Sequence, residues 1–296
     1  MITYDRLFIG GSWAEPSNPQ LLDIASPHDR SVVGRAAQAQ PADIDRAVAM
    51  ARASFEAGEW RLIPPAERIA VLRKFNALRE ESAEKIARLI SLENGSAGWF
   101  TRAGQPGLTR QANAYLRAAE EFAWEERLVP SDPASPVRSV VRREAVGVVA
   151  AVIPWNSPFS SATSKIIPAL VTGNSVVLKV SPENSLSMGF LAELLERVGL
   201  PEGVISVLPA DRETSEYLVS HPEVDKMVSV LGFSFSGTGQ NAALAFVPLK
   251  PWDERKGAEH SAAALAGRAF GALSGIRDAF IFALSPPSIP ELGNAT

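Results

Sequence analysis

Two apolar runs separated by an amphipathic stretch dominate the middle of the chain. The run Val148 to Ile153 is continuously apolar and leads into a Pro-Trp-Asn turn. A second apolar run, Ser175 to Leu178, ends on Lys179. Between the two runs, apolar residues recur at helical spacing over Ser160 to Leu170. This pattern predicts a β-α-β unit, in which the two strands lie parallel.

Polar side chains follow both of these predicted strands. Asn156 comes just after the first strand, and Lys179 closes the second. In doubly wound sheets, ligands bind beyond the carboxyl ends of the strands, so these two residues are candidate site residues. The residues alone leave alternatives open, because a turn Asn often bonds its own backbone and a strand-end Lys is often only solvated.

The same reasoning predicts elements on both sides of this unit. In the amino-terminal half we expect a hairpin over 7–13 with Gly10-Gly11 as its turn, a strand near 31–35, a helix over 41–55 with Asp43 as its N-cap, a long helix from 64 that breaks near 80–83, a helix over 110–126, a Pro-rich link over 132–137 and an exposed hairpin strand over 137–143. After the unit we expect a helix over 187–198, a strand over 204–208, a short helix over 214–220 and a strand over 224–230. The alternation of strands and helices from about 145 to 230 predicts an α/β fold with a parallel sheet.

The sequence changes in character after residue 230. A Gly/Ser-rich turn within 234–239 precedes an apolar strand over 242–249, an alanine-rich helix over 258–276 and a strand over 279–284. This order predicts a small β-α-β piece at the end of the chain.

Composition narrows the classes of protein that remain. The 296 residues are 46% hydrophobic with a net charge of −4, which is typical of soluble globular domains. Basic residues are interspersed with acidic ones, so we expect no nucleic-acid partner. No apolar run approaches the ~18 residues of a membrane span, and no signal peptide pattern opens the chain, so we expect a cytoplasmic protein without a membrane partner. The three histidines, His28, His221 and His260, lack metal-ligand spacing, and no metal site is expected.

Six motifs occur in one order along the first 230 residues. They are LFIGGSW at 7–13, ASPHDRSVVGRAA at 25–37, ISLENG at 90–95, VRREAVGVVAAVIPWNSPF at 141–159, IIPALVTGNSVVLKVSPENS at 166–185 and HPEVDK at 221–226. With these motifs, residues ~4–229 resemble the amino-terminal half of an NAD(P)-dependent aldehyde dehydrogenase. The resemblance implies the Rossmann-like cofactor domain of that family, with flanking helices and an exposed hairpin.

The remaining residues resemble a different family. GFSFSGTGQNAALAFVPLKPWDERKG and IRDAFIFALSPPSIPELGNAT are similar to a periplasmic porter segment of resistance–nodulation–division efflux pumps. We therefore interpret the chain as a chimera joined near Ser229 to Leu231. The expected domains are a truncated cofactor-binding domain over 1–230 and an efflux-transporter-like fragment over 231–296.

The first resemblance implies roles for the residues that follow the two central strands. The family uses the Asn of its Pro-Trp-Asn turn to donate a hydrogen bond to a developing oxyanion, and here that residue is Asn156. The Lys equivalent to Lys179 binds the hydroxyls of the adenosine ribose. The implied cofactor-binding residues are Ile153, Pro154, Trp155, Lys179, Ser181 and Glu183, with Trp155 either lining the cofactor slot or acting as an aromatic plug.

The choice between NAD and NADP stays open at this point. Members of the family that prefer NAD often carry a carboxylate three residues after the Lys. Here Pro182 holds that position, and Glu183 lies one residue later. The cofactor is therefore expected to be NAD or NADP, bound weakly or not at all, and the intact family acts on small aldehydes.

The chain departs from the family beyond Val230. The family continues into a Phe-Thr-Gly-Ser turn that receives the pyrophosphate, whereas this chain reads Leu231-Gly232-Phe233-Ser234. SFSGTG at 234–239 is best interpreted as a turn. Glu291-Leu292-Gly293 matches the general-base motif only superficially, because its neighbours fit the transporter tail.

The chain has no cysteine. Aldehyde oxidation in this family needs a thiol that forms a thiohemiacetal, and a serine hydroxyl cannot replace it at an accessible pKa. We expect an oxidoreductase domain without turnover. The alternative is a non-enzymatic chimeric fragment with a porter tail and no transport activity. A third interpretation is a partly misfolded fusion. The resemblance implies that the hairpin near 130–143 pairs with a catalytic domain that is missing here, and the unpaired strand edge would then favour oligomers or aggregates.

Overall fold

The computed structural model describes residues 1–129 and 139–224, the backbone of the strands at 226–227, 231–234 and 237–243, and positions 264, 267 and 268. Its contacts divide the chain into two units, Met1–Val228 and Ser229–Thr296, and each is described by itself.

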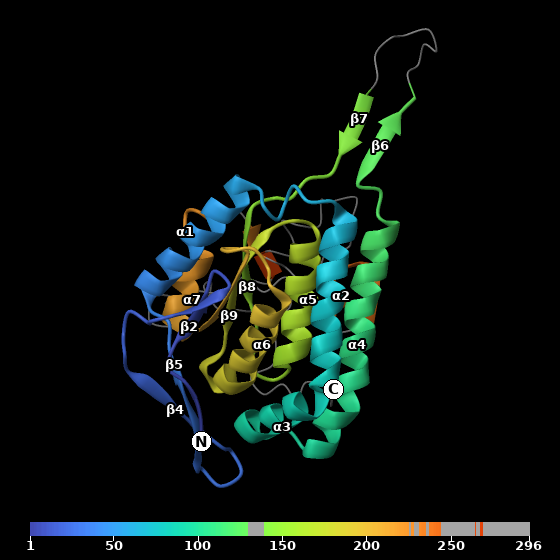
Figure 1. Ribbon diagram of the computed structural model, residues 1–296. Helices are drawn as coiled ribbons and strands as arrows, with labels where there is room; N and C mark the ends of the chain where they lie inside the picture. Colours follow the sequence, from blue (N-terminus) through green and yellow to red (C-terminus); the bar gives the residue numbers. More distant parts are fainter. Residues whose placement is uncertain are drawn as a thin grey trace. The chain divides into compact units, whose positions relative to one another are not determined.

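The first unit alternates strands and helices along most of its length (Figure 1). Its strands are β1 (Ile2–Tyr4), β2 (Leu7–Ile9), β3 (Ser12–Ala14), β4 (Leu21–Ala25), β5 (Val32–Ala37), β6 (Glu125–Leu128), β7 (Ser139–Arg142), β8 (Val148–Val152), β9 (Ser175–Val180), β10 (Ile205–Pro209) and β11 (Lys226–Met227). Its helices are α1 (Pro41–Ala57), α2 (Pro65–Glu81), α3 (Ala83–Asn94), α4 (Gly98–Glu121), α5 (Pro158–Val171), the 3₁₀ turn η1 (Pro182–Asn184), α6 (Ser185–Val198) and α7 (Arg212–Val219).

The described part of this unit holds one six-stranded sheet, in the order β11-β8-β9-β10-β2-β3. The first four of these strands are parallel, as predicted from the alternation of strands and helices. The hairpin β2-β3 adds two antiparallel strands beside β10. The strands β1, β5 and β4 form a separate three-stranded sheet, and β6 pairs with β7. The α/β architecture predicted from the sequence is confirmed.

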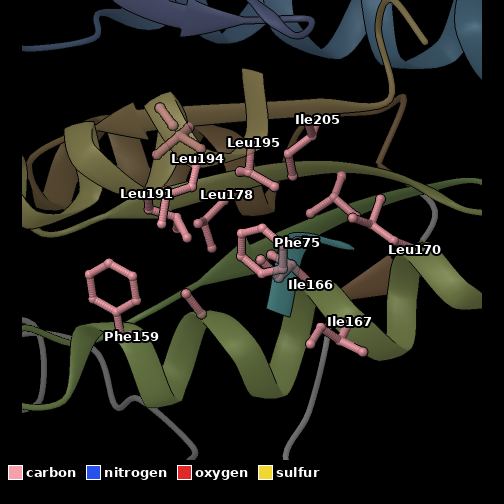
Figure 2. Packing of buried hydrophobic residues seen from close by; sticks show 14 of the residues in the cluster. Phe75, Phe159, Ile166, Ile167, Leu170, Leu178, Leu191, Leu194, Leu195 and Ile205 are labelled. Carbon is pink, nitrogen blue, oxygen red and sulfur yellow. The ribbon is translucent and has the colours of Figure 1, made fainter. Parts of the chain in front are cut away.

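Helices cover both faces of the six-stranded sheet. On one face, Val148 and Val177 pack with Ile44 and Val48 of α1. On the other face, α5 and α6 lie against the strands, and α2 packs with them (Figure 2). Because β9 is buried along its whole length, its residues are nearly all apolar rather than alternating with polar ones. Each fully buried Leu or Ile in these layers contributes about 1.5–3 kcal/mol.

Two helix predictions need correction. The helix expected over 110–126 is α4, which begins 12 residues earlier at Gly98 and ends at Glu121, and residues 125–128 form strand β6. Asp43 is not the N-cap of α1, because Gln40 takes that position. The Asp43 carboxylate instead accepts the backbone N–H of Gln40 at 3.0 Å from inside the first turn.

Several strands differ from the predictions in extent. The short strands β1 and β4 were not predicted. The strand expected over 224–230 is assigned at Lys226–Met227, and 228–230 lie outside the described residues. The link over 132–137 also lies outside them. The long helix does break as predicted, because Ser82 separates α2 from α3.

In the second unit the structure describes one antiparallel hairpin, β12 (Leu231–Ser234) with β13 (Gly237–Ala243). Ser234 and residues 237–239, predicted as part of a turn, therefore belong to strands. Of the strand predicted over 242–249, residues 242 and 243 belong to β13. The remainder of that predicted strand, the helix at 258–276 apart from positions 264, 267 and 268, and the strand at 279–284 lie outside the described residues. Within the described parts of both units, none of the helices is long and apolar enough to cross a membrane.

Candidate functional site

The turn after β8 carries the first group of candidate residues. Ile153 is buried, and its backbone N–H donates to the Lys179 carbonyl at 3.1 Å, which extends the β8–β9 ladder by one residue. Pro154, Trp155 and Asn156 follow and are exposed at the carboxyl edge of the sheet. Helix α5 then begins at Pro158, where proline fits the first helical turn.

Lys179 lies on the neighbouring strand in the middle of the sheet. It pairs in register with Val152 of β8 and Leu208 of β10, and only 8% of its surface is exposed. Burial lowers the pKa of its ammonium group, whereas the carboxylates of Glu183 and Asp211 act in the opposite direction. Both acidic side chains are therefore near enough to act electrostatically on the ammonium group.

Two turns supply these carboxylates. Ser181 follows β9, and its hydroxyl donates to the carboxylate of Glu183 in the 3₁₀ turn η1. Asp211 follows β10 and caps α7, because its carboxylate accepts the backbone N–H of Thr214 at 2.9 Å. That hydrogen bond is the main reason why the pKa of Asp211 is lowered. The lowered pKa keeps the Asp211 carboxylate ionised at neutral pH.

This arrangement suits a ligand with neighbouring hydroxyl groups. A Lys ammonium donates up to three hydrogen bonds, and a carboxylate only accepts them. A vicinal diol can donate to the carboxylate of Glu183 or Asp211 while its oxygens accept from Lys179. The site has a net charge of about −1 from these three groups, so an additional phosphate would meet repulsion.

The end of helix α3 contacts the segment after β9, at the start of α6, and the Pro-Trp-Asn turn after β8. The buried carboxylate of Glu93 accepts the backbone N–H of Leu186 at 2.9 Å and that of Ser187 at 3.1 Å, at the start of α6. Burial raises the pKa of Glu93 to about 7, against the lowering effect of these hydrogen bonds. The side-chain amide of Asn94 donates to the Trp155 carbonyl at 3.3 Å.

The structure brings together most of the residues expected from the sequence. Lys179 is the second-last residue of β9, Ser181 and Glu183 follow that strand, and Ile153 to Asn156 follow the adjacent strand β8. Their binding roles remain predictions. Sequence reasoning missed Asp211, although an Asp just before a short helix is a recognisable N-cap. It also missed Glu93 and Asn94, which had served only as part of the ISLENG motif.

Neither of the two histidines in the described part of the chain contacts the candidate residues at this edge. His28 is exposed, and His260 lies outside the described residues. His221 Nε2 lies 3.3 Å from Asp45, and its Nδ1 accepts the Glu223 backbone N–H at 3.1 Å. Among the described residues, no three His, Asp or Glu side chains are grouped so that they could hold a metal ion.

Two family models match the chain. The model of the aldehyde dehydrogenase family matches residues 13–238. The model of the AcrB/AcrD/AcrF family matches residues 208–296, so the two matches overlap over 208–238. The chain therefore carries an amino-terminal aldehyde dehydrogenase region and a partial match to the efflux-pump family, as the sequence motifs predicted.

Individual relatives and a solved structure agree with the first match. The chain is 36% identical over 226 residues to geranial dehydrogenase of Castellaniella defragrans, covering 76% of this chain and 47% of that protein. It is 35% identical over 223 residues to the NADP/NAD-dependent aldehyde dehydrogenase PuuC of Escherichia coli, covering 75% and 44%. It superposes on a Mycobacterium tuberculosis aldehyde dehydrogenase solved with NAD+ with a TM-score of 0.71 and 38% identity, covering 76% and 46%. The chain thus spans less than half the length of these relatives.

Proposed function

Because the chain belongs to the aldehyde dehydrogenase family, we propose that residues 1–230 form a cofactor domain that binds a nicotinamide dinucleotide at the carboxyl edge of its sheet. The observation that carries this proposal is the group formed by Lys179, Glu183 and Asp211 at the ends of adjacent parallel strands. A relative solved with NAD+ and a relative named as NADP/NAD-dependent support it.

The adenosine ribose would bind at Lys179, with Glu183 or Asp211 accepting from its hydroxyls. Ser181 holds the Glu183 carboxylate in place by donating its hydroxyl hydrogen. The nicotinamide half would lie along Ile153, Pro154 and Trp155 on the adjacent strand end. A bound dinucleotide would supply the hydride acceptor, and the residues named above would bind and orient it.

Asn156 would supply the oxyanion donor. It is exposed at the amino end of α5, where its amide is free to turn toward a carbonyl oxygen of an aldehyde. An amide in such a position stabilises negative charge that develops on that oxygen.

The polypeptide is proposed to bind dinucleotide weakly and to oxidise no aldehyde. Its 296 residues include no cysteine, so no thiolate is available to attack the aldehyde carbon and form the thiohemiacetal from which hydride leaves. The segment after Val230 also lacks the family's pyrophosphate-binding turn. We expect a dissociation constant on the order of 1 mM, or about 4 kcal/mol of binding free energy.

The proposed domain boundary follows residue 230. The division of contacts at Val228 and Ser229 supports this position, as does the end of the aldehyde dehydrogenase match at residue 238. The second candidate function, favoured by the match over 208–296, is a non-enzymatic chimera in which residues 231–296 form a porter-derived fragment without transport activity.

We further propose that the chain associates with itself through the hairpin β6-β7. Within the described residues these strands pair only with each other. Leu128, Val140 and Val141 are exposed on these strands. Such an edge pairs readily with another chain. A monodisperse monomer by light scattering would contradict this proposal.

A fluorescence titration tests the binding proposal. NADH accepts excitation energy from tryptophan, and Trp155 lies at the proposed nicotinamide side with 55% of its surface exposed. Added NADH should therefore quench the tryptophan emission in a saturable manner, and Trp155→Phe should reduce that quenching. Absence of saturable quenching would contradict dinucleotide binding, and NADH production from NAD+ and an aldehyde would contradict the proposed inactivity.

A further inference from the structure

Helix α3 ends between two turns of the proposed dinucleotide site, the Pro-Trp-Asn turn after β8 and the turn after β9 that carries Ser181 and Glu183. Its last two residues, Glu93 and Asn94, are adjacent in the chain but contact different turns. Gly95 then ends the helix in the left-handed conformation, with φ of 78°. A single fixed helix end therefore touches both halves of the site.

Glu93 fixes the start of α6. Only 3% of its surface is exposed, and its carboxylate accepts the backbone N–H groups of Leu186 and Ser187 in the first turn of that helix. These N–H groups have no partners within the helix, and the positive end of the helix dipole favours the carboxylate. Since α6 directly continues η1, Glu93 also holds the turn that carries Ser181 and Glu183.

Asn94 fixes the other turn. Its Oδ1 accepts the backbone N–H of Ser96 at 3.0 Å, which orients the amide so that Nδ2 donates to the Trp155 carbonyl at 3.3 Å. Trp155 is exposed, as are its neighbours Pro154 and Asn156. This hydrogen bond therefore connects an otherwise exposed turn to the body of the unit.

We propose that Glu93 and Asn94 are positioning residues that together set the spacing between the two turns, Glu93 for the adenosine half of the dinucleotide and Asn94 for the nicotinamide half. The inference rests on the proposed function, because it takes the two turns to be the two halves of one binding site. It assigns separate effects to two neighbouring side chains, which general destabilisation of the fold would not produce.

Saturation-transfer NMR with NAD+ tests this separation, since adenine and nicotinamide protons report independently within one ligand. Glu93→Ala should lower the saturation transfer to the adenine protons relative to that of the nicotinamide protons, because the turn that would contact the adenosine half is no longer held by the two hydrogen bonds to α6. Asn94→Ala should reduce it at the nicotinamide protons instead. Glu93→Gln should restore part of the adenine signal, because its amide oxygen still accepts the Leu186 N–H.

Glu84→Ala is the matched control on the same helix. Its carboxylate pairs with Arg102 at the exposed surface, far along α3 from the site, and both signals should equal those of the unmodified chain. Equal losses at both ends of the ligand in Glu93→Ala and Asn94→Ala, or no loss in either, would overturn the inference.

Hydrogen exchange distinguishes failure of this inference from failure of the proposed function. If the unmodified chain gives no saturation transfer at all, dinucleotide binding fails, and the same variants still test the positions of the turns. Glu93→Ala should then speed amide exchange over 181–188 only, and Asn94→Ala over 153–158 only. If both variants speed exchange in both segments, or in neither, the two residues do not hold the turns separately.

Discussion

Arg68 and Val171 are joined by a hydrogen bond of 2.9 Å from the guanidinium Nε to the backbone carbonyl, although they lie 103 residues apart in the chain. The same guanidinium donates to the carbonyls of Arg61 and Ile63. Trp60 donates from Nε1 to the Leu170 carbonyl at 2.9 Å. Two long side chains from outside α5 therefore satisfy the last carbonyls of the helix that follows the Pro-Trp-Asn turn.

Arg68→Met should destabilise the first unit by about 2–4 kcal/mol, because buried carbonyls lose charged donors. Urea denaturation followed by circular dichroism measures this change. Arg73→Met is the control on the same helix, because Arg73 forms an exposed ion pair with Glu120 worth about 0–1 kcal/mol. Equal midpoints for the two variants would show that the buried cap contributes nothing.

Glu93 makes stability depend on pH. Its folded pKa of about 7 lies above the ordinary value of 4.5, because burial disfavours the charged form. The folded state therefore binds the proton more tightly, and this stabilisation is complete below about pH 4.5 and is lost as the pH rises through 7. The free energy of unfolding should fall by about 3 kcal/mol between pH 5 and pH 8, relative to Glu93→Gln. If the free energy of unfolding changes with pH in the same way in the unmodified chain and in Glu93→Gln, the pKa of Glu93 is not raised.

Two glycines should respond in opposite directions to alanine. A Cβ at Gly189 on α6 would lie 2.6 Å from the ring of Tyr4, which stacks on Trp13 and donates its hydroxyl to Glu193. Because the ring is held on two sides, Gly189→Ala should destabilise by about 1–3 kcal/mol. Gly104 on α4 has open space around it, so Gly104→Ala should stabilise by about 0.5–1 kcal/mol. Thermal denaturation distinguishes them, and a stabilising Gly189→Ala would show that Tyr4 moves aside.

The acidic pair around Lys179 predicts a preference for NAD+ over NADP+. The 2′-phosphate of NADP+ would enter a site with two carboxylates, Glu183 and Asp211, and one cation, Lys179, so the carboxylates would repel it. Glu183→Gln should reduce the NAD+ to NADP+ affinity ratio by about threefold or more, through loss of one like charge. Glu202→Gln, exposed at the opposite end of β10, should leave the ratio unchanged. An unchanged ratio in Glu183→Gln would show that this carboxylate does not face the ribose.

Much of the fold could be predicted because short, contiguous sequence patterns specify its helices, strands and turns. The runs over β8 and β9 and the turn at Gly10-Gly11 are short patterns that packing did not override. Helix α4 begins 12 residues before the predicted start at residue 110, and this added part contains Gly98, Gly104 and Pro106, which have poor helix propensity. In the structure, Leu108, Ala112 and Leu116 bury one face of that helix, and this packing outweighs the propensity.

The site could be predicted only where it follows a strand end directly. Asn156 and Lys179 were proposed as site residues in this way, since a polar residue at the end of an apolar run is visible in the sequence. Glu93 was not, because its partners Leu186 and Ser187 lie more than 90 residues away and are backbone groups. No local pattern records such a contact.

Calorimetric titration of the purified chain with NAD+, beside the Lys179→Met variant, tests the central claim most directly. The account predicts saturable heat for the unmodified chain and at least a tenfold weaker affinity for Lys179→Met, because the ribose hydroxyls lose their cationic donor. Light scattering on both samples shows whether they share one state of association. No saturable heat from the unmodified chain, or equal affinity in the variant, would contradict a dinucleotide site at the carboxyl edge of this sheet.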